Sequence, residues 1–109
     1  MPRYMIQFAY TANAWAALAK NPVDRRPGVR RVLEKVGGKL IDLYYNFGEY
    51  DGVVLIEAPD DTAANGAVLA FTAPGHLKAT RTTRLFTVEE AMEAMRTAGA
   101  IPYEAPSAK

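Results

Sequence analysis

The sequence contains no cysteine and only one histidine, His76. Without cysteine the chain has no disulfide framework, thiolate metal site, iron–sulfur cluster or cysteine nucleophile. A single histidine also leaves one chain without the ligands of a His-rich metal centre. We therefore expect no metal site and no cofactor.

The sequence also lacks a strong charge of either sign and any long hydrophobic run. Thirteen Lys and Arg residues stand against twelve Asp and Glu, a formal net charge of +1, so the broad positive field that attracts nucleic acid is missing. The longest apolar runs, such as 67–73, are far shorter than the roughly 20 residues that cross a bilayer. The first residues also lack the basic region followed by an apolar stretch that is typical of a secretory signal. We therefore predict a cytoplasmic protein without nucleic-acid or membrane partners.

The length and composition are those of one globular domain. The chain has 109 residues, of which 50% are hydrophobic and 23% charged, and this length leaves no room for a second core. The polar tail after Gly99 contains one short apolar segment, 101–103. We expect a domain over residues 1–99 and a tail over 100–109, with the apolar segment lying on its own domain or on a partner.

The first half of the chain predicts a strand, two helices and a second strand. Residues 3–10 alternate with aromatics on one side, and 11–20 places apolar residues at helical spacing. Asn21 is expected to cap the second helix, with Asp24 as its capping-box partner, and Pro27 to start or kink that helix. Gly37-Gly38 ends it, with one glycine at positive φ, and 39–47 forms the next strand.

The second half predicts a strand, a helix, a strand and a final helix. Residues 53–56 are apolar on both sides, as in a central strand, and Asp60 or Asp61 caps the helix that Pro74-Gly75 stops. A threonine-rich strand covers 77–86. Thr87 and Glu90 form a capping box for a helix that runs to about Gly99.

This order predicts an α+β, ferredoxin-like βαββαβ fold: an antiparallel sheet with helices on one face, plus an extra C-terminal helix. The expected strand order is fourth, first, third, second. Which alternating side chains face the helices stays open at this point. Either choice leaves an apolar second face that needs a cover, and a second copy of the sheet would provide it. We therefore predict a homodimer or higher homo-oligomer.

One turn and its flanks carry a resemblance to a known family. The segment Gly48-Glu49-Tyr50-Asp51, preceded by Gly37-Gly38-Lys39 and followed by 53–61, resembles the GYD domain family, and the likeness extends over roughly 3–97. Here Glu49 stands between the glycine and Tyr50. The resemblance implies a ferredoxin-like domain of the dimeric α/β-barrel type. It transfers no catalytic residue.

Two side chains are candidates for acid–base chemistry. His76 has an unperturbed pKa near neutrality and stands where a strand begins, so it is a candidate general base. Asp51, beside Glu49 and Tyr50, is a second candidate if burial raises the pKa of a carboxyl group. The structural alternatives are a surface or capping role for His76 and a backbone-turn role for Asp51.

An aromatic concentration in the first half suggests a ligand site. Aromatic side chains with polar tips can line an apolar cavity, although aromatics at strand spacing also form ordinary core. The candidate ligand-binding residues are Tyr10, Trp15, Tyr44, Tyr45, Tyr50 and Arg81. Four arginines between 25 and 31 are interpreted as a solvated helix face rather than as a phosphate site.

Three functions follow from these features. The first is a homodimeric domain that binds a small organic ligand between its sheet and its partner. The second is a cofactor-free small enzyme, an isomerase, cyclase or monooxygenase, with His76 or Asp51 as base. The third is a structural subunit of a larger assembly, which would bury the 101–103 segment and enclose no cavity.

Overall fold

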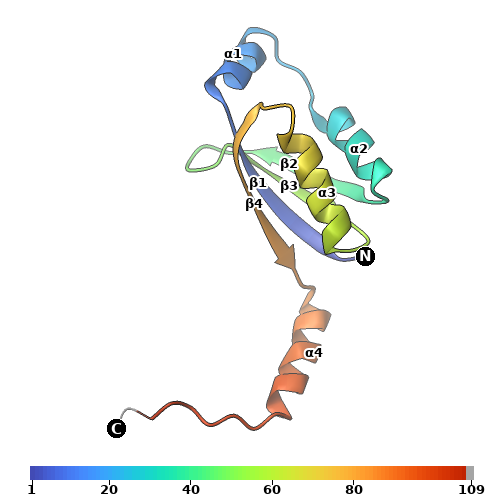
Figure 1. The fold of residues 1–109 in the computed structure, drawn as a ribbon, viewed down its shortest axis with the longest axis vertical. Helices are drawn as coiled ribbons and strands as arrows, with labels where there is room; N and C mark the ends of the chain where they lie inside the picture. Colours follow the sequence, from blue (N-terminus) through green and yellow to red (C-terminus); the bar gives the residue numbers. More distant parts are fainter. Residues whose placement is uncertain (108–109) are drawn as a thin grey trace.

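A computed structural model describes residues 1–107 and confirms the predicted fold class (Figure 1). In chain order, the elements are β1 (Arg3–Tyr10), α1 (Ala12–Lys20), α2 (Arg26–Lys35), β2 (Lys39–Tyr45), β3 (Gly52–Glu57), α3 (Asp61–Thr72), β4 (Leu77–Leu85) and α4 (Val88–Gly99). The strands form one antiparallel sheet in the order β2-β3-β1-β4, as the sequence predicts. The helices α2 and α3 cover one face of this sheet.

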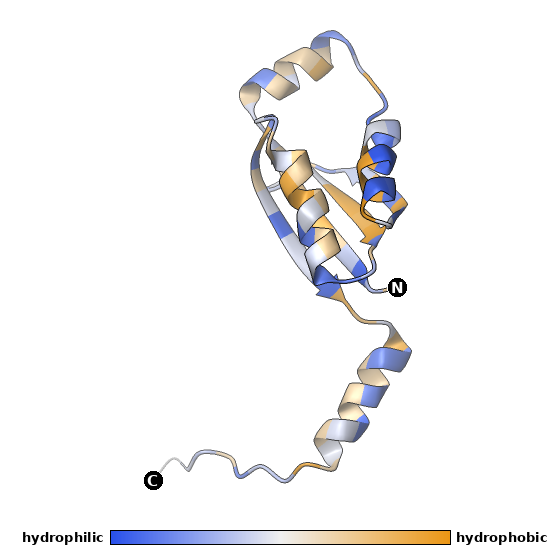
Figure 2. Cartoon of the chain, turned by 45° about the vertical axis from the view of Figure 1, so that its right-hand side comes forward, coloured by the Kyte–Doolittle hydropathy of each residue, from blue (hydrophilic) through white to orange (hydrophobic). Residues whose placement is uncertain are grey.

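The helix-covered face holds the core, and it is the aromatic set of β1 that points there. The side chains of Tyr4, Ile6, Phe8 and Tyr10 are at most 5% exposed, and β3 adds Val54 and Ile56. Leu33 of α2 and the Ala64, Ala67 and Val68 stripe of α3 complete the cluster. In Figure 2 β3 is hydrophobic where the two helices lie over it.

The one polar atom that Tyr4 carries into the core has a partner. The Tyr4 hydroxyl donates to Asp61 Oδ1 at 2.5 Å, which joins β1 to the first turn of α3. Burial, followed by this hydrogen bond, raises the pKa of Tyr4 to about 12. Tyr4 therefore stays neutral and acts as a structural link between sheet and helix.

The opposite face of the sheet, called the open face below, carries the other alternating set. Cross-strand partners share a face, and the pairings Met5↔Leu55, Met5↔Thr83, Gln7↔Val53 and Gln7↔Arg81 run across it. On β2 the open face continues through Asp42 and Tyr44, which pair with Leu55 and Val53. None of the helices in the described part of the chain covers this face.

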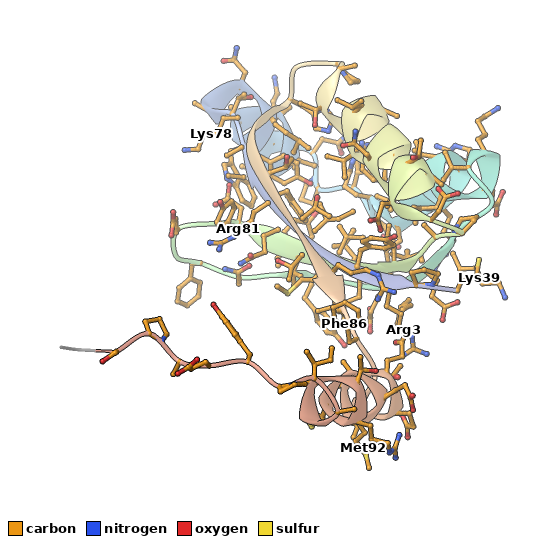
Figure 3. The ribbon with its side chains drawn as sticks, turned by 60° about the horizontal axis from the view of Figure 1, so that its bottom comes forward. Arg3, Lys39, Lys78, Arg81, Phe86 and Met92 are labelled. Atoms are coloured by element: carbon orange, nitrogen blue, oxygen red, sulfur yellow. The ribbon has the colours of Figure 1, made fainter. Side chains whose placement is uncertain are left out.

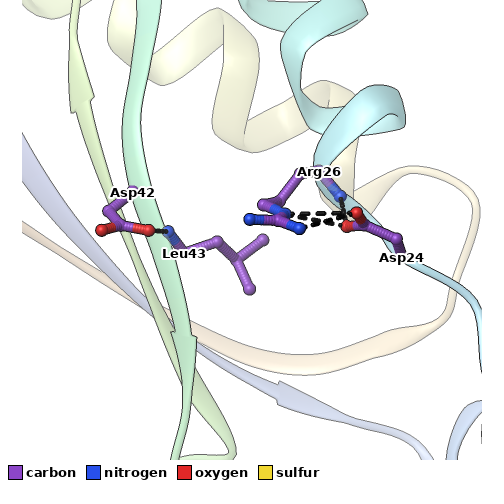
Figure 4. Close-up of polar contacts among 4 residues, drawn as sticks. All are labelled: Asp24, Arg26, Asp42 and Leu43. Carbon is purple, nitrogen blue, oxygen red and sulfur yellow. Dashed lines mark hydrogen bonds and ion pairs between the residues drawn. The ribbon is translucent and has the colours of Figure 1, made fainter.

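The start of α2 differs from the prediction. Asn21 ends α1 instead of capping α2, and α2 begins five residues later, with Pro27 in its first turn. Pro27 therefore starts this helix and does not kink it, because its fixed φ suits a first turn. Asp24 is not a capping-box partner: it holds the Arg26 guanidinium at 2.9 Å (Figure 4). Hydrogen bonds from Arg26 lower the pKa of Asp24 to about 2.

The second strand is shorter and less regular than predicted. A register shift between Leu40 and Asp42 marks a bulge at Ile41, so strict alternation ends there. Leu40, Leu43 and Tyr45 therefore share the helix-covered face with Ile56, Val54 and Gly52. Phe47, expected inside the strand, lies beyond its end and is fully exposed.

The helix-end glycine adopts the predicted conformation. Gly37 has φ 77° directly after α2, and this left-handed backbone penalises any Cβ. We expect Gly37→Ala to lower the free energy of unfolding by about 1 kcal/mol, measured by urea titration. Gly66→Ala is the matched control: inside α3 its Cβ meets nothing within 4 Å, so it should raise stability by about 0.5–1 kcal/mol. Equal effects of the two substitutions would contradict this account.

Candidate functional site

A cavity of about 180 Å³ lies between the helix-covered face of the sheet and helices α2 and α3. Its walls are mainly apolar. β1 contributes Ile6 and Phe8, and the other three strands contribute Leu43, Val54 and Leu77. The helices contribute Val29, Val32, Val68 and Phe71. The polar residues on its lining are Arg25, His76, Tyr10 and Thr80.

One end of the cavity is formed by an aromatic cluster around Tyr10. The Tyr10 ring lies 5.1 Å from that of Trp15, 5.3 Å from Phe8 and 6.2 Å from His76. The first two contacts are edge-to-face, the arrangement that aromatic quadrupoles favour. The Tyr10 and Tyr45 hydroxyls lie 3.1 Å apart. Burial, followed by this hydrogen bond, raises the pKa of Tyr10, so the Tyr10 hydroxyl stays neutral.

Asp51 fastens this cluster to the backbone. Its Oδ2 accepts from the Tyr10 amide at 2.8 Å and from Trp15 Nε1 at 3.0 Å. Its own amide donates to the Phe8 carbonyl at 2.8 Å. The aspartate of the GYD turn therefore ties the end of β1 to α1 and fixes the orientation of Trp15.

His76 lies at the cavity with part of its ring exposed. Its carbonyl accepts from the Thr11 amide at 2.9 Å, so the start of β4 is bound to the start of α1. Burial, followed by the charge of Arg25, lowers the pKa of His76 below its ordinary value. At neutral pH the imidazole is therefore uncharged and can accept a proton or a hydrogen bond.

The lowered pKa of His76 makes stability depend on pH. The unfolded chain, with a histidine pKa of about 6.5, binds a proton before the folded chain does, so the free energy of unfolding falls as pH decreases. We expect the melting temperature to drop between about pH 7.5 and pH 5.5, and His76→Gln to remove most of that drop. An equal slope in the wild type and in His76→Gln would contradict a partly buried, neutral imidazole.

The fold brings together some of the predicted site residues and separates others. Tyr10, Trp15, Tyr45, Asp51 and His76 meet at one end of the sheet. Tyr44 and Arg81 lie on the open face, so they belong to a different surface from the cavity. Tyr50 lies in the turn after β2, where its carbonyl accepts from the Asn46 side chain at 2.8 Å.

Sequence analysis missed the contribution of the two helices to the site. Arg25 was interpreted as part of a solvated helix face, yet it lines the cavity at the start of α2. Pro27 is the available signal: proline favours the first turn of a helix, so Arg25, two residues earlier, falls at the N-cap and outside the helical repeat. Val29, Val32 and Phe71 also line the cavity, and their helical spacing predicts a buried helix face without distinguishing a cavity wall from ordinary core.

Within residues 1–107, no three histidine, aspartate or glutamate side chains lie close enough together to hold a metal ion. In the same range, no helix is both long and apolar enough to span a membrane.

The strand order, the helices on one face and the cavity beneath them define a ferredoxin-like α+β domain with a mainly apolar pocket. The family model of the GYD domain matches residues 4–95, and the chain therefore belongs to the GYD domain family.

Solved structures of similar fold are distant in sequence. The 30S ribosomal protein S6 of Thermotoga maritima is 16% identical with a TM-score of 0.58, over 87% of this chain and 97% of that chain. FFRP-DM1 is 15% identical with a TM-score of 0.53, over 79% and 100%. MtbAldR is 17% identical with a TM-score of 0.52, over 79% of this chain and 52% of that one, about half its length. These likenesses show the fold alone, and no curated protein matches the sequence significantly.

Proposed function

We propose that this GYD domain is a homodimeric binding protein that takes a small organic molecule into the cavity beneath α2 and α3. The observation that carries the proposal is the apolar cavity of about 180 Å³ with Arg25 and His76 on its lining. The proposed site differs from the sequence-based expectation of a ligand between sheet and partner. The open face is left for the second copy, and we place the protein's action in the cytoplasm, as the sequence predicts.

The chemistry of the cavity indicates the class of ligand. In another protein an apolar cavity of roughly 150 Å³ accepts benzene, so this volume suits one ring or a short branched chain. The guanidinium of Arg25 can pair with a carboxylate, and the Tyr10 hydroxyl can donate to it while accepting from Tyr45. A neutral imidazole at His76 adds no opposing charge. A small aromatic or branched aliphatic acid therefore fits best.

Trp15 provides the measurement, since it is the single tryptophan of the chain and packs on Tyr10. Benzoate should change its fluorescence in a saturable way. Arg25→Gln should weaken binding about tenfold or more, because a hydrogen bond to a charged group contributes about 1.5–3 kcal/mol. Arg31→Gln, six residues along and outside the cavity lining, is the matched control and should bind as the wild type does. Val29→Phe should fill the cavity and abolish binding.

The binding proposal fails if benzoate, phenol and cyclohexanecarboxylate all leave Trp15 fluorescence unchanged at millimolar concentrations. It also fails if Arg25→Gln and Arg31→Gln have equal effects. Circular dichroism of each variant separates a loss of binding from a loss of fold.

A second candidate function is a cofactor-free enzyme with His76 as general base. The observation that favours it is the uncharged imidazole on the lining of the cavity. Asp51 is the weaker candidate for the base, because its carboxylate already accepts from two N–H donors and is not part of the cavity lining. If His76 is the base, His76→Gln should bind benzoate normally and lose all turnover of an activated carbon acid.

A further inference from the structure

Helix α4 is well formed but buries none of its residues. Its capping box is complete: Glu90 N donates to Thr87 Oγ1 at 3.1 Å, and Thr87 N donates to Glu90 Oε1 at 2.9 Å. The helix has 12 residues, and an isolated helix of about 12–15 residues is only marginally stable in water. Capping alone therefore does not account for this helix, and its apolar side needs a surface to pack on.

The apolar side of α4 is a continuous stripe at helical spacing. The stripe consists of Val88, Ala91, Met92 and Met95. Val88 is 71%, Met92 45% and Met95 66% exposed. In Figure 3 the Met92 side chain points away from the sheet. Large exposed apolar patches of this kind mark interaction sites in folded proteins.

The described chain is far more extended than one domain of its length. Its radius of gyration is 17.9 Å and its longest extent is 59 Å, whereas about 13 Å is typical for a compact chain of this size. Figure 1 shows the reason, since α4 projects from the end of β4. The segment 101–103, expected to lie on the domain or on a partner, follows α4 outward, with Ile101 61% and Tyr103 80% exposed.

The open face by itself offers a limited flat area for a dimer. Four strands of about seven residues span a planar area of roughly 450 Å², while a stable interface buries about 800 Å² on each partner. A helix of 12 residues is about 18 Å long, close to the length of the sheet. Adding α4 to the open face supplies the missing area.

Charge also favours this pairing. The Arg81 side chain, on the open face, makes no ion pair or hydrogen bond within residues 1–107, and the Glu89 side chain, beside the stripe of α4, makes none in that range either. Burying Arg81 without an anion would be unfavourable. Glu89 from a second copy can provide that anion.

We propose that α4 is an exchanged arm: the stripe of one protomer packs on the open face of a second copy, over Val53 and Leu55, with Glu89 near the partner's Arg81. Two-fold symmetry then makes both exchanges equivalent, so each chain gives one arm and receives one. The inference rests on the dimer in the proposed function and does not depend on the ligand cavity.

The first test introduces the same charge on two sides of α4. Met92→Asp lies on the stripe, whereas Ala94→Asp lies outside it and is the matched control. By sedimentation equilibrium we expect Met92→Asp to weaken the dimer about 100-fold or more and Ala94→Asp to change the dissociation constant less than about threefold. In both variants the ferredoxin-like domain should stay folded, as judged by circular dichroism. Equal dissociation constants for the two variants would overturn the exchanged arm.

The second test uses the absence of cysteine, because each introduced thiol is then unique. Met95→Cys and Leu55→Cys chains are purified separately, mixed, and treated with a short bismaleimide. A mixed cross-linked dimer is the expected product, and the Lys78→Cys chain should give none with Met95→Cys. If Leu55→Asp dissociates the protein but no mixed cross-link forms, the sheet dimer stands and the arm proposal is wrong. A wild type that sediments as a monomer would refute both, whatever benzoate does.

Discussion

Replacing Ile56 with aspartate is expected to unfold the domain, while replacing its neighbour Leu55 is expected to leave a folded monomer. Ile56 is completely buried and points from β3 to the core beneath the helices. Leu55 points to the open face, where it pairs with Met5. The same charge at two adjacent positions of β3 is therefore expected to have two different effects: unfolding at Ile56 and dissociation at Leu55.

The size of the two effects follows from where each charge is placed. A carboxylate in a dry core costs several kcal/mol even when it becomes protonated, and Ile56→Asp also removes a buried side chain whose loss costs about 2–5 kcal/mol. The whole domain is stable by only about 5–15 kcal/mol. Leu55→Asp leaves the core unchanged, because its side chain reaches water in the monomer, and its charge is buried only when two copies meet.

Circular dichroism and light scattering distinguish the outcomes. Ile56→Asp should lose its secondary structure, whereas Leu55→Asp should keep the wild-type spectrum at half the wild-type mass. Val54→Asp and Val53→Asp repeat the comparison two residues earlier, since Val54 is 5% exposed in the core and Val53 lies on the open face. A folded dimer in all four variants would rule out both the observed strand orientation and the proposed interface.

This comparison depends on a choice that the sequence does not make. In β1 both alternating sets contain apolar side chains, so periodicity predicts the strand but not its core face. The set of Tyr4, Ile6, Phe8 and Tyr10 points inward because its larger side chains fill the space below α2 and α3. In β2 the bulge at Ile41 has no local signal, since the two-for-one pairing arises from the register with β3.

The site could be predicted only in part, for a related reason. Aromatic enrichment identifies Tyr10, Trp15 and Tyr45, and the turn chemistry identifies Asp51. The position of the cavity depends on how completely α2 and α3 fill the space over the sheet. This depends on side-chain volumes from several elements, which no local sequence pattern predicts. Tyr44 was grouped with Tyr45, although neighbours in a strand point to opposite faces.

Gly52→Ala should be strongly destabilising, because the added methyl group has no space in the sheet. Gly52 is the residue after the GYD turn, and it pairs with Phe8 on one side and Tyr45 on the other. A Cβ there would lie 2.4 Å from Phe8 Cζ and 2.7 Å from the Tyr44 carbonyl oxygen. Neither neighbour can move away easily, because the carbonyl belongs to the sheet backbone and the Phe8 ring is 5% exposed.

We expect Gly52→Ala to lower the free energy of unfolding by about 3 kcal/mol, the upper part of the usual range for overpacking a core, measured by urea titration. Because Phe8 lines the cavity, displacement of its ring should also weaken benzoate binding. Phe8→Leu in the same chain removes the ring atoms that the new methyl group would meet, so the double variant should be more stable than the sum of the single effects by about 1 kcal/mol or more. Strictly additive effects would mean that the Tyr44 carbonyl, and not Phe8, requires glycine at the end of the GYD turn.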